Sequence, residues 1–500
     1  MSDPTLVGRW QEWHNPSQIS QLQKLAEFTD PTLMINPLEI ASNGQGYQPA
    51  IHRDFQSLGA VLLNNLAAKM SGMLFPVNQP NFRVQVSDAM KQAAQIQHNW
   101  DSSQLQTAVA TIERKACERL YLGNSYTKLQ RAIKLCIVSG ECLVYRNGDQ
   151  GNIVVWNRHS YAVRRDPLGR VWKILLKQSV TRETLPMNME AIVEAVGYAG
   201  GKADLFTQVE FKESPIPGTP RVAVITHEVN GKPVDVSSTM PEHLCPLFVA
   251  TWTVQDGEHY ARGLVENFAG DFARLSALSE NLTMYEISSL TCVRLVNTEA
   301  VSKIQDFEQA KTGDYVANGP GNAPGIIDFD TGNHNKIIAI NQSINIISQR
   351  LAQAFMYSGM QRDSERTTAT EVSMVAKEAD QALGGAYSQL AQTLQSPLAY
   401  LTMMELGDDI TSGLIGEHLK PSIVTGVQAL ARSADTQRLL ELAQLAQTIP
   451  ILTGVDPTLD AKKILERMAS NAGVDLTDLA KSAEQLHQEA QAQAQQAQTQ

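Results

Sequence analysis

Apolar side chains recur at three- and four-residue spacing along several stretches of the chain, and this spacing predicts helices. In the first stretch, we expect Asp54 to cap a helix whose apolar face holds Phe55, Leu58, Leu62, Leu66, Met70 and Met73. Two more helices are expected over residues 105–116 and 129–137, with Gly123-Asn124 as the turn between them. The first 50 residues are polar and interrupted by prolines, which favours a short helix followed by an extended arm.

The spacing changes at Gly140, where short runs rich in β-branched and aromatic residues begin. Asn147-Gly148 and Asp166-Pro167-Leu168-Gly169 have the composition of hairpin turns. Residues 140–255 are therefore predicted to form a largely antiparallel sheet packed on the preceding helices, which makes an α+β body. The expected strands are 141–146, 153–157, 161–165, 171–177, 205–211, 221–227 and 247–253.

From Gly263 onward the pattern is helical again. A helix of roughly 30 residues, about 45 Å long at 1.5 Å per residue, is followed by a Gly- and Pro-rich stretch over 313–332 and a second helix over 342–357. A third helix is expected over 368–405, bent at Gly384-Gly385 and Pro397, and the chain from 422 is again helical. Two long helices that bracket a small strand-and-loop module are an uncommon arrangement for an enzyme.

Composition and charge restrict the function. Hydrophobic residues make up 43% of the chain and charged residues 19%, which is typical of a folded protein. The net charge of -11 argues against a repressor-like grip on DNA, because counterion release at a basic patch supplies most of that affinity. A conduit through which DNA slides remains compatible. The sequence shows no signal peptide and no apolar stretch long enough to cross a membrane, so we expect a soluble intracellular protein.

The candidate chemical motifs are incomplete. The stretch 196–203 resembles a phosphate loop, but its spacing is wrong and Ala203 replaces the Ser or Thr that would hold magnesium. Asp328 and Asp330 lack the spacing of a calcium loop, and the five scattered cysteines form no C-x-x-C pair and predict reduced, buried thiols. We therefore expect no catalytic residues, no metal and no cofactor, and the protein is not predicted to be an enzyme.

Two segments are more informative. The first joins the last expected strand to the long helix and contains Trp252, Tyr260, Arg262 and Gly263. The second, before the third long helix, contains Arg366, Thr367, Thr368, Thr370 and Glu371. Without further context, Thr368-x-x-Glu371 has the spacing of a capping box, so an ordinary well-capped helix is the alternative interpretation of the second segment.

The order of these features resembles the portal, or head-to-tail connecting, proteins of short-tailed bacteriophages, over about residues 50–410. The order is helices, sheet, Trp…Tyr-x-Arg-Gly, long helix, Gly/Pro module, helix, Glu-Arg-Thr-Thr-Ala-Thr-Glu-Val and long helix. One departure is Ala261, where the family usually has glycine before the arginine, and this puts the geometry of that turn in doubt.

The resemblance implies a mainly helical portal fold with an antiparallel-sheet wing, paired stem helices, a small α/β clip and a helical crown. The implied regions are an N-terminal arm (1–50), the wing (51–262), stem helices (263–289 and 342–357), the clip (290–341), a channel loop (358–367), a long wing helix and return (368–421), the crown (422–484) and a Gln/Ala-rich tail or barrel (485–500). The implied DNA-channel residues are Gly359, Met360, Gln361, Arg362, Ser364, Glu365 and Arg366.

The implied function is a ring of twelve subunits at one head vertex, through which double-stranded DNA is packaged and ejected. Implied partners are the terminase packaging motor, then tail adaptor and tail proteins, together with capsid, scaffold and internal core proteins, in the virion and in the host cytoplasm during assembly. Two alternatives stay open. One is another ring-forming head–tail adaptor or scaffold without a channel loop. The other is a nucleic-acid enzyme subunit, against which the missing acid cluster and phosphate loop count.

Overall fold

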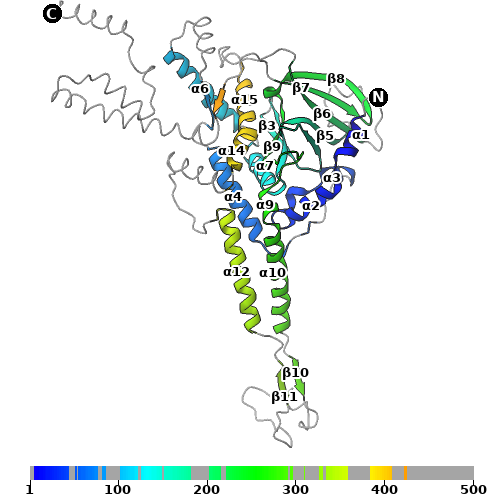
Figure 1. The fold of residues 1–500 in the computed structure, drawn as a ribbon, viewed down its shortest axis with the longest axis vertical. Coiled ribbons are helices and arrows are strands. Elements are labelled where there is room, and N and C mark those ends of the chain that lie inside the picture. The colour runs from blue at the N-terminus through cyan, green and yellow to red at the C-terminus, as the bar shows by residue number, and fades with distance from the viewer. Residues whose placement is uncertain are drawn as a thin grey trace, which may run out of the picture.

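The chain folds into a body of helices and antiparallel sheets from which two long helices extend (Figure 1). This architecture confirms the predicted mixture of helices and antiparallel sheet, the α+β class. The computed structural model describes residues 5–43, 51–52, 54–76, 81–85, 102–121, 125–148, 151–181, 202–214, 221–290, 293–296, 309, 326–329, 334–357, 383, 385–407 and 422–424.

The N-terminal segment is more regular than its polar sequence predicts. It forms α1 (Leu6–Trp13), α2 (Pro16–Glu27), the 3₁₀ turn η1 (Pro31–Met34) and α3 (Pro37–Asn43). The side chains of Thr5, Asn15 and Asp30 cap the first three, and the prolines occupy first-turn positions, where they need no N–H donor. The expectation of an extended arm over residues 5–43 was therefore wrong.

Helix α1 lies against the outer sheet. The backbone N–H groups of Leu6 and Val7 donate to the carboxylate of Glu228 at 2.6 and 3.3 Å, and Arg9 donates to the side-chain oxygen of Gln208 at 2.6 Å. A carboxylate at a helix N-terminus satisfies free N–H groups and is favoured by the helix dipole. The start of the chain is thus fixed to strands that come about 200 residues later.

The next helices are α4 (Leu58–Leu74), α6 (Ser102–Leu120) and α7 (Ser125–Ser139). The predicted apolar stripe of α4 is buried at Leu62, Leu66 and Met70. The predicted cap was wrong, because α4 begins four residues after Asp54 and the side-chain oxygen of Gln56 accepts from Gly59 N–H instead. Asp54 accepts from Ser276 and from its neighbour Phe55, whose side chain is 58% exposed.

The strands between residues 140 and 255 form two antiparallel sheets rather than the single sheet expected. The inner sheet has the order β3-β2-β9, and the outer sheet has the order β4-β5-β6-β7-β8. Inner-sheet bounds are β2 (Glu141–Asn147), β3 (Asn152–Trp156) and β9 (Leu247–Thr251). Outer-sheet bounds are β4 (Tyr161–Arg165), β5 (Val171–Thr181), β6 (Lys202–Lys212), β7 (Val222–Val229) and β8 (Lys232–Pro241).

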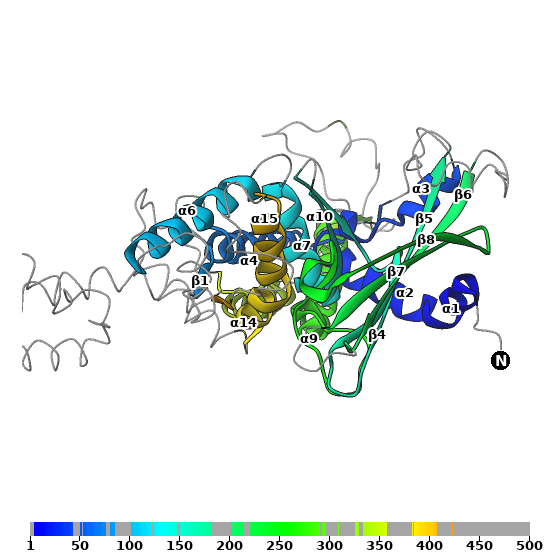
Figure 2. The ribbon, with the colours of Figure 1, turned by 90° about the horizontal axis from the view of Figure 1, so that it is seen from above.

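The inner sheet lies between the helices and the outer sheet (Figure 2). Cys142 and Val144 of β2 point to the helical core with α4 and α7, whereas Leu143 packs with Val163 and Ile174 of the outer sheet. Alternate residues of a strand face opposite sides, so β2 separates two hydrophobic layers. This explains why its sequence is apolar at consecutive positions.

The two long helices come next in the chain. The short helix α9 (Leu264–Asn267) and α10 (Ala269–Leu290) replace the single long helix expected from Gly263, because the chain breaks at Phe268. Strands β10 (Val293–Val296) and β11 (Ile326–Phe329) form an antiparallel pair at the far end (Figure 1). Helix α12 (His334–Ala354) returns to the body and begins eight residues earlier than predicted.

The last described elements pack back on the body. They are α14 (Ala386–Leu390), the π-helical turn η4 (Ala391–Gln395) and α15 (Ser396–Met404). Both predicted bend points depart from a regular α-helix, since Gly385 is left-handed (φ 82°) and η4 ends two residues before Pro397, which cannot continue an α-helical ladder. Residues 422–424, expected to be helical, form β12 (Ser422–Val424), which pairs with β1 (Arg83–Gln85).

Candidate functional site: the helix pair and its elbow

Trp252, Tyr260, Arg262 and Gly263 all lie in one elbow segment, residues 252–263, which links β9 to α9 and α10. Trp252 is buried, and its N–H donates to the carbonyl of Gly140 at 2.7 Å. Arg262 N–H donates to the carbonyl of Thr253 at 2.8 Å, which closes the segment into a narrow loop. The four residues singled out from the sequence therefore share one structural unit.

The elbow segment packs directly on the corner between α7 and β2. Gly140 is left-handed (φ 85°), and a Cβ there would collide with the carbonyl of Ala261. A Cβ on Gly263 would lie 2.5 Å from the carbonyl oxygen of Ile137. Both contacts are backbone to backbone, so glycine is required at both positions. Ala261 is absent from the described residues with positive φ, so the departure from the family's glycine does not strain the turn.

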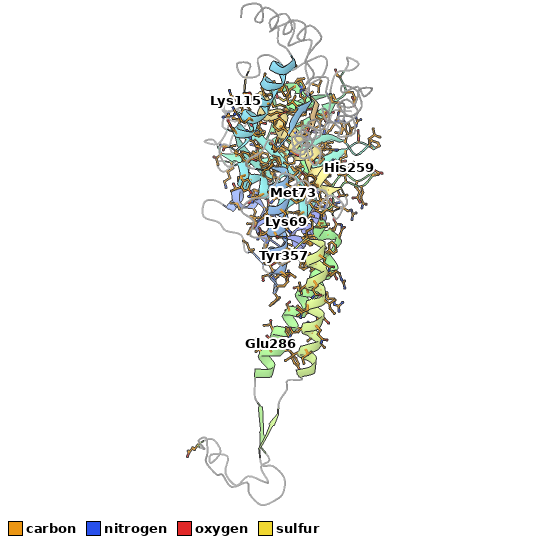
Figure 3. The ribbon with its side chains drawn as sticks, turned by 90° about the vertical axis from the view of Figure 1, so that its left-hand side faces the viewer. Lys69, Met73, Lys115, His259, Glu286 and Tyr357 are labelled. Atoms are coloured by element: carbon orange, nitrogen blue, oxygen red, sulfur yellow. The ribbon has the colours of Figure 1, made fainter. Side chains whose placement is uncertain are left out.

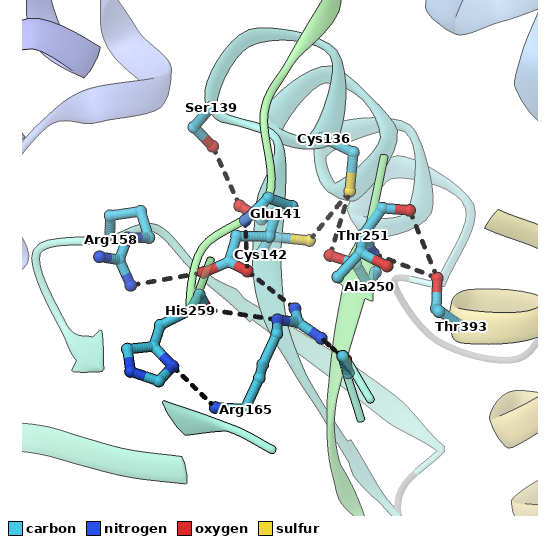
Figure 4. A network of polar contacts seen from close by, with 12 residues as sticks. Cys136, Ser139, Glu141, Cys142, Arg158, Arg165, Ala250, Thr251, His259 and Thr393 are labelled. Atoms are coloured by element: carbon cyan, nitrogen blue, oxygen red, sulfur yellow. Dashed lines mark hydrogen bonds and ion pairs between the residues drawn. The ribbon is translucent and has the colours of Figure 1, made fainter. Parts of the chain in front are cut away.

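Glu141 is the centre of a buried ion-pair network beneath the elbow (Figure 4). Its carboxylate lies 3.4 Å from Arg158 Nη1 and 3.0 Å from Arg165 Nη2, and it accepts from Ala261 N–H at 3.3 Å. The guanidinium of Arg158 also stacks over the ring of Tyr260, 3.4 Å from its centroid. Tyr260 in turn donates to the carbonyl of Trp13 at 3.0 Å. The network thus ties the elbow to both sheets and to α1.

The electrostatics of this network point to a structural role. Burial alone would lower the pKa of Arg158, but the charge of Glu141 and the nearby Tyr260 and Tyr161 raise it above its ordinary value. Burial, with the negative charge of Glu141, raises the pKa of Tyr161 well above its usual range. Arg158 and Tyr161 therefore keep their protonation states near neutral pH and hold the elbow in place rather than exchange protons.

On the outside of the elbow, Arg262 binds two carboxylates. Its guanidinium lies 2.6 Å from Glu258 and 2.9 Å from Glu266. Hydrogen bonding to Glu258, with the charges of both carboxylates, raises the pKa of Arg262 further above its ordinary value. Glu258 precedes α9 and Glu266 lies within it, so this exposed bridge joins the elbow segment to the first turn of the helix.

Helices α10 and α12 form an antiparallel helix pair that extends from the body (Figures 1 and 3). Near the body, Phe272 and Phe355 are buried edge to face, with ring centroids 5.8 Å apart, and Phe28 of the N-terminal segment stacks on Phe272. Asp271 and Arg350 join the two helices on the exposed side at 3.0 Å. The pair is therefore rigidly attached at its root.

Further from the body the helix pair carries apolar side chains that face solvent. The exposed fraction is 63% for Met284 and 58% for Ile287 on α10. It is 42% for Ile338 and 59% for Ile346 on α12. Each helix thus carries large apolar residues that its partner in the same chain does not cover.

A second buried ion pair, missed from the sequence, holds the end of α15. Glu405 binds Arg146 at 2.6 Å and Arg119 at 3.2 Å, and the Arg146 side chain is fully buried. Nothing in the local sequence distinguishes Glu141 or Glu405 from surface carboxylates, because their partners are distant in the chain. The only available signal was the position of Glu141 directly after a glycine at a strand start.

A cavity of about 800 Å³ lies between α2 and the elbow segment. Its walls include Leu22, Phe28 and Ala269, with Lys24 and Glu12 among its charged residues. The charged residues that line it are of both signs. In the part of the chain that the structure describes, no group of three His, Cys, Asp or Glu side chains could hold a metal ion. None of the described helices is long and apolar enough to cross a membrane.

The predicted channel residues Gly359, Met360, Gln361, Arg362, Ser364, Glu365 and Arg366 lie outside the described residues, as do Thr367, Thr368, Thr370 and Glu371. Residues 196–201 of the phosphate-loop-like stretch, Cys292 and the chain after residue 424 do so as well, whereas Lys202 and Ala203 begin strand β6. The other four cysteines are free and buried, as expected.

Comparison with known proteins gives a consistent picture. The family model described as "Bacteriophage head to tail connecting protein" matches residues 5–479. The "Portal protein" of Pseudomonas phage phiKMV is 40% identical over 492 residues, which cover 98% of this chain and 94% of that protein. The "Portal protein" of Escherichia phage T7 is 28% identical over 481 residues, which cover 94% of this chain and 86% of that protein. Among solved structures, a chain from the neck of an empty GTA particle aligns with a TM-score of 0.39 and 12% identity, covering 88% of this chain and 94% of that chain.

Proposed function

This chain belongs to the family of bacteriophage head to tail connecting proteins, and from that premise we propose that it acts as a portal protein, a ring at one head vertex through which double-stranded DNA is packaged and ejected. Copies of the chain stand side by side around a common axis. Following the family, the closed ring contains twelve of them. Each copy contributes one part of the channel wall and performs no covalent chemistry.

The observation that carries this proposal is the helix pair with its exposed apolar residues. Met284 and Ile287 on α10, and Ile338 and Ile346 on α12, stay exposed although the two helices pack on one another, so each helix of a copy offers apolar side chains to a neighbouring copy. When the α10 side of one copy packs on the α12 side of the next, the contact is heterologous, and such contacts close into a ring if the rotation permits. Burial in that contact removes the exposed isoleucines and methionine from water.

The regions of the chain take these roles in the ring. The body up to the elbow is the wing, and the helix pair is the stem. The strands β10 and β11 begin and end the clip, which we now end at residue 333 because α12 starts at His334. Residues 358–367 form the channel loop, 368–421 the long wing helix and its return, 422–484 the crown and 485–500 the tail or barrel.

The partners follow from these positions. The clip, at the end of the stem, docks the terminase packaging motor and later the tail adaptor and tail proteins. The wing and crown meet capsid, scaffold and internal core proteins. The channel loop contacts DNA in transit, and the protein works in the virion after assembly in the host cytoplasm.

The experiment that tests the ring is mutation of the exposed apolar surface. Met284→Asp with Ile346→Asp places charges in the contact and removes the gain from burying each side chain, about 1.5–3 kcal/mol. We expect negative-stain images and light scattering to show rings for the original protein and at least tenfold weaker assembly for the variant.

The matched control is Leu168→Asp, which changes a 76% exposed residue of the hairpin between β4 and β5. It should leave the rings intact. If the original protein is a compact single-copy species, or if the double variant assembles as well as the control, the proposal is wrong. A ring that forms but retains and packages DNA normally after deletion of residues 359–365 would instead favour an adaptor without a channel loop.

A further inference from the structure

The buried network around Glu141 contains more positive than negative charge. The carboxylate of Glu141 lies between the guanidinium groups of Arg158 and Arg165, and the three side chains are 0%, 3% and 5% exposed (Figure 4). Among the described residues, Glu141 is the only carboxylate that forms an ion pair with either arginine. Buried charges in folded proteins are normally paired, and two cations that share one anion leave one positive charge without a counter-charge.

The two arginines differ in how many acceptors they have. Arg165 donates from all three of its side-chain nitrogen atoms, to Glu141 at 3.0 Å and to two backbone carbonyls at 3.2 and 3.3 Å. In the described part of the chain, Arg158 has a single bond to a carboxylate, from Nη1 to Glu141 at 3.4 Å. Tyr260 adds its ring face and its hydroxyl to the surroundings of Arg158, and both are neutral. A guanidinium has five N–H donors, so Arg158 carries the surplus charge and keeps donors for a further acceptor.

Arg158 lines the cavity of about 800 Å³ between α2 and the elbow segment. A volume of this size is typical of sites for small organic ligands. Trp13, Phe28 and Tyr260 give the cavity aromatic walls, and Leu22 adds an apolar one. Apolar walls with one buried cation favour a ligand whose polar end is an anion.

The other charges of the cavity lining agree with this polarity. Two of its carboxylates are already paired with Arg262. The remaining charged side chains are Lys24, Arg158, Arg164 and Glu12. Arg164 is half-buried, with its guanidinium 5.2 Å from the centre of the Trp13 ring, whereas Glu12 is exposed. The better buried side chains of this set are therefore both positive.

We propose that this cavity binds a small ligand through an oxyanion, a carboxylate or a phosphate group, which pairs with Arg158 and has Arg164 as its second cation. Carboxylates and phosphates accept charge-assisted hydrogen bonds from the edge of a guanidinium. The bound group supplies the negative charge that Glu141 alone does not, and it joins α2 to the elbow segment. The cavity lies within one copy of the chain, so this inference goes beyond the proposed ring and does not depend on it.

A carboxylate of a second copy is the other source of the same chemistry. Ala269 and Ala273 of α10 line the cavity, so a neighbouring copy that packs on α10 comes close to it. In the packing proposed above, that neighbour presents α12, whose sequence HNKIIAINQSINIISQRLAQA contains no Asp or Glu. A ligand from solution is therefore favoured.

The test is thermal unfolding of the full chain in sodium phosphate and in sodium succinate, each compared with sodium chloride at equal ionic strength and pH. The two probes separate a phosphate from a carboxylate group. We expect at least one of them, at about 10 mM, to raise the melting temperature by at least about 3 °C, which corresponds to a Kd of about 1 mM. Equilibrium dialysis with the labelled anion should show about one bound anion per chain.

Two variants remove the proposed contacts. Arg158→Met takes away the donors and leaves Glu141 and Arg165 as a balanced pair, so the variant should fold and lose at least about tenfold in affinity for the anion. Arg164→Gln changes a half-buried side chain and should weaken binding by at least about threefold. The matched control is Arg114→Gln, at a 70% exposed position of α6 outside the cavity, which should bind within about twofold of the original protein.

The inference is wrong if neither anion stabilises the original protein more than chloride does. It is also wrong if Arg164→Gln binds the anion as well as Arg114→Gln does. If Arg158→Met breaks up rings in light scattering and the original protein binds neither anion, a second copy supplies the carboxylate and the ligand assignment fails. An original protein that binds the anion but forms no ring supports this inference and overturns the portal function alone.

Discussion

The carboxylate of Glu141 accepts a hydrogen bond from the backbone N–H of Ala261, a residue 120 positions later, at 3.3 Å. The same carboxylate neutralises Arg158 and Arg165, whose side chains are 3% and 5% exposed. One buried side chain therefore holds the elbow segment, the inner sheet and the outer sheet together, and its removal should destabilise all three.

We expect Glu141→Gln to lower the free energy of unfolding by about 3–5 kcal/mol, because two buried guanidinium groups lose their counter-charge. Chemical denaturation followed by circular dichroism measures the change. The control is Glu258→Gln at the exposed bridge to Arg262, which should change stability by less than about 1 kcal/mol. Equal effects of the two substitutions would show that the buried network does not stabilise the body.

A second prediction concerns Gly263 at the end of the elbow segment. In Gly263→Ala, the new methyl group meets the backbone carbonyls of Ile137 and Val138 at 2.5 and 2.7 Å, which cannot move without shifting α7. We expect a loss of about 2–3 kcal/mol in the free energy of unfolding.

Gly270 provides the comparison, seven residues further on in α10. A Cβ there meets nothing within 4 Å, so Gly270→Ala should raise stability by about 0.5–1 kcal/mol through helix propensity. Thermal unfolding of both variants measures the two changes in stability. Stabilisation by Gly263→Ala would contradict the close contact between Gly263 and the backbone of α7.

The third prediction is a pH dependence that arises at His14. Burial, with the nearby charges of Arg158, His159 and Lys177, lowers the pKa of His14 from 6.5 to about 4 in the folded protein. Between pH 4 and 6.5 the unfolded chain binds more protons than the folded one. The contribution of His14 to the free energy of unfolding is therefore fully present above pH 6.5 and is lost as the pH falls toward 4.

We therefore expect His14→Gln to narrow the gap in melting temperature between pH 7.5 and pH 5. Burial also lowers the pKa of His159, His227 and His259, so part of the gap should remain. A gap as wide as in the original protein would mean that His14 is protonated in the folded state.

The fourth prediction concerns the thiols. Burial raises the pKa of Cys136 well above its usual range and that of Cys245 to about 12. The reactive thiolate is therefore scarce, and we expect alkylation by iodoacetamide at pH 8 to be more than about 100-fold slower in the folded protein than in urea. The experiment uses a Cys292→Ser background and mass spectrometry of the labelled peptides. Rapid labelling of either cysteine in the folded protein would contradict their burial.

The helices that line the core were predictable, because a buried helix face repeats in the sequence. Leu62, Leu66 and Met70 are an example, and Ile347, Leu351 and Phe355 are another. Strand β8 was missed because its sequence, KPVDVSSTMP, is polar and lies at the edge of the outer sheet. Asn230-Gly231, with φ values of 47° and 83°, was the hairpin signal that could have found it.

The candidate site was only partly predictable. Trp252, Tyr260, Arg262 and Gly263 were found because they are close together in sequence. Glu141 was not, because a buried carboxylate and a surface carboxylate look alike until the fold brings their partners near. The predicted cap at Asp54 failed for a similar reason, since its oxygen is used by Ser276 on another helix.

The docking of α1 has a consequence for how the protein is made. Helix α1 leaves the ribosome long before its partners, because its N–H groups bind Glu228 and its last carbonyl accepts from Tyr260. Trp10 packs on Phe206 and the start of the helix binds Glu228, so α1 cannot dock fully until these strands of the outer sheet have been synthesised. Helix α1 therefore docks on the body late. A chain that ends before these partners leaves the apolar face of α1 exposed, where quality-control proteases and chaperones can recognise it.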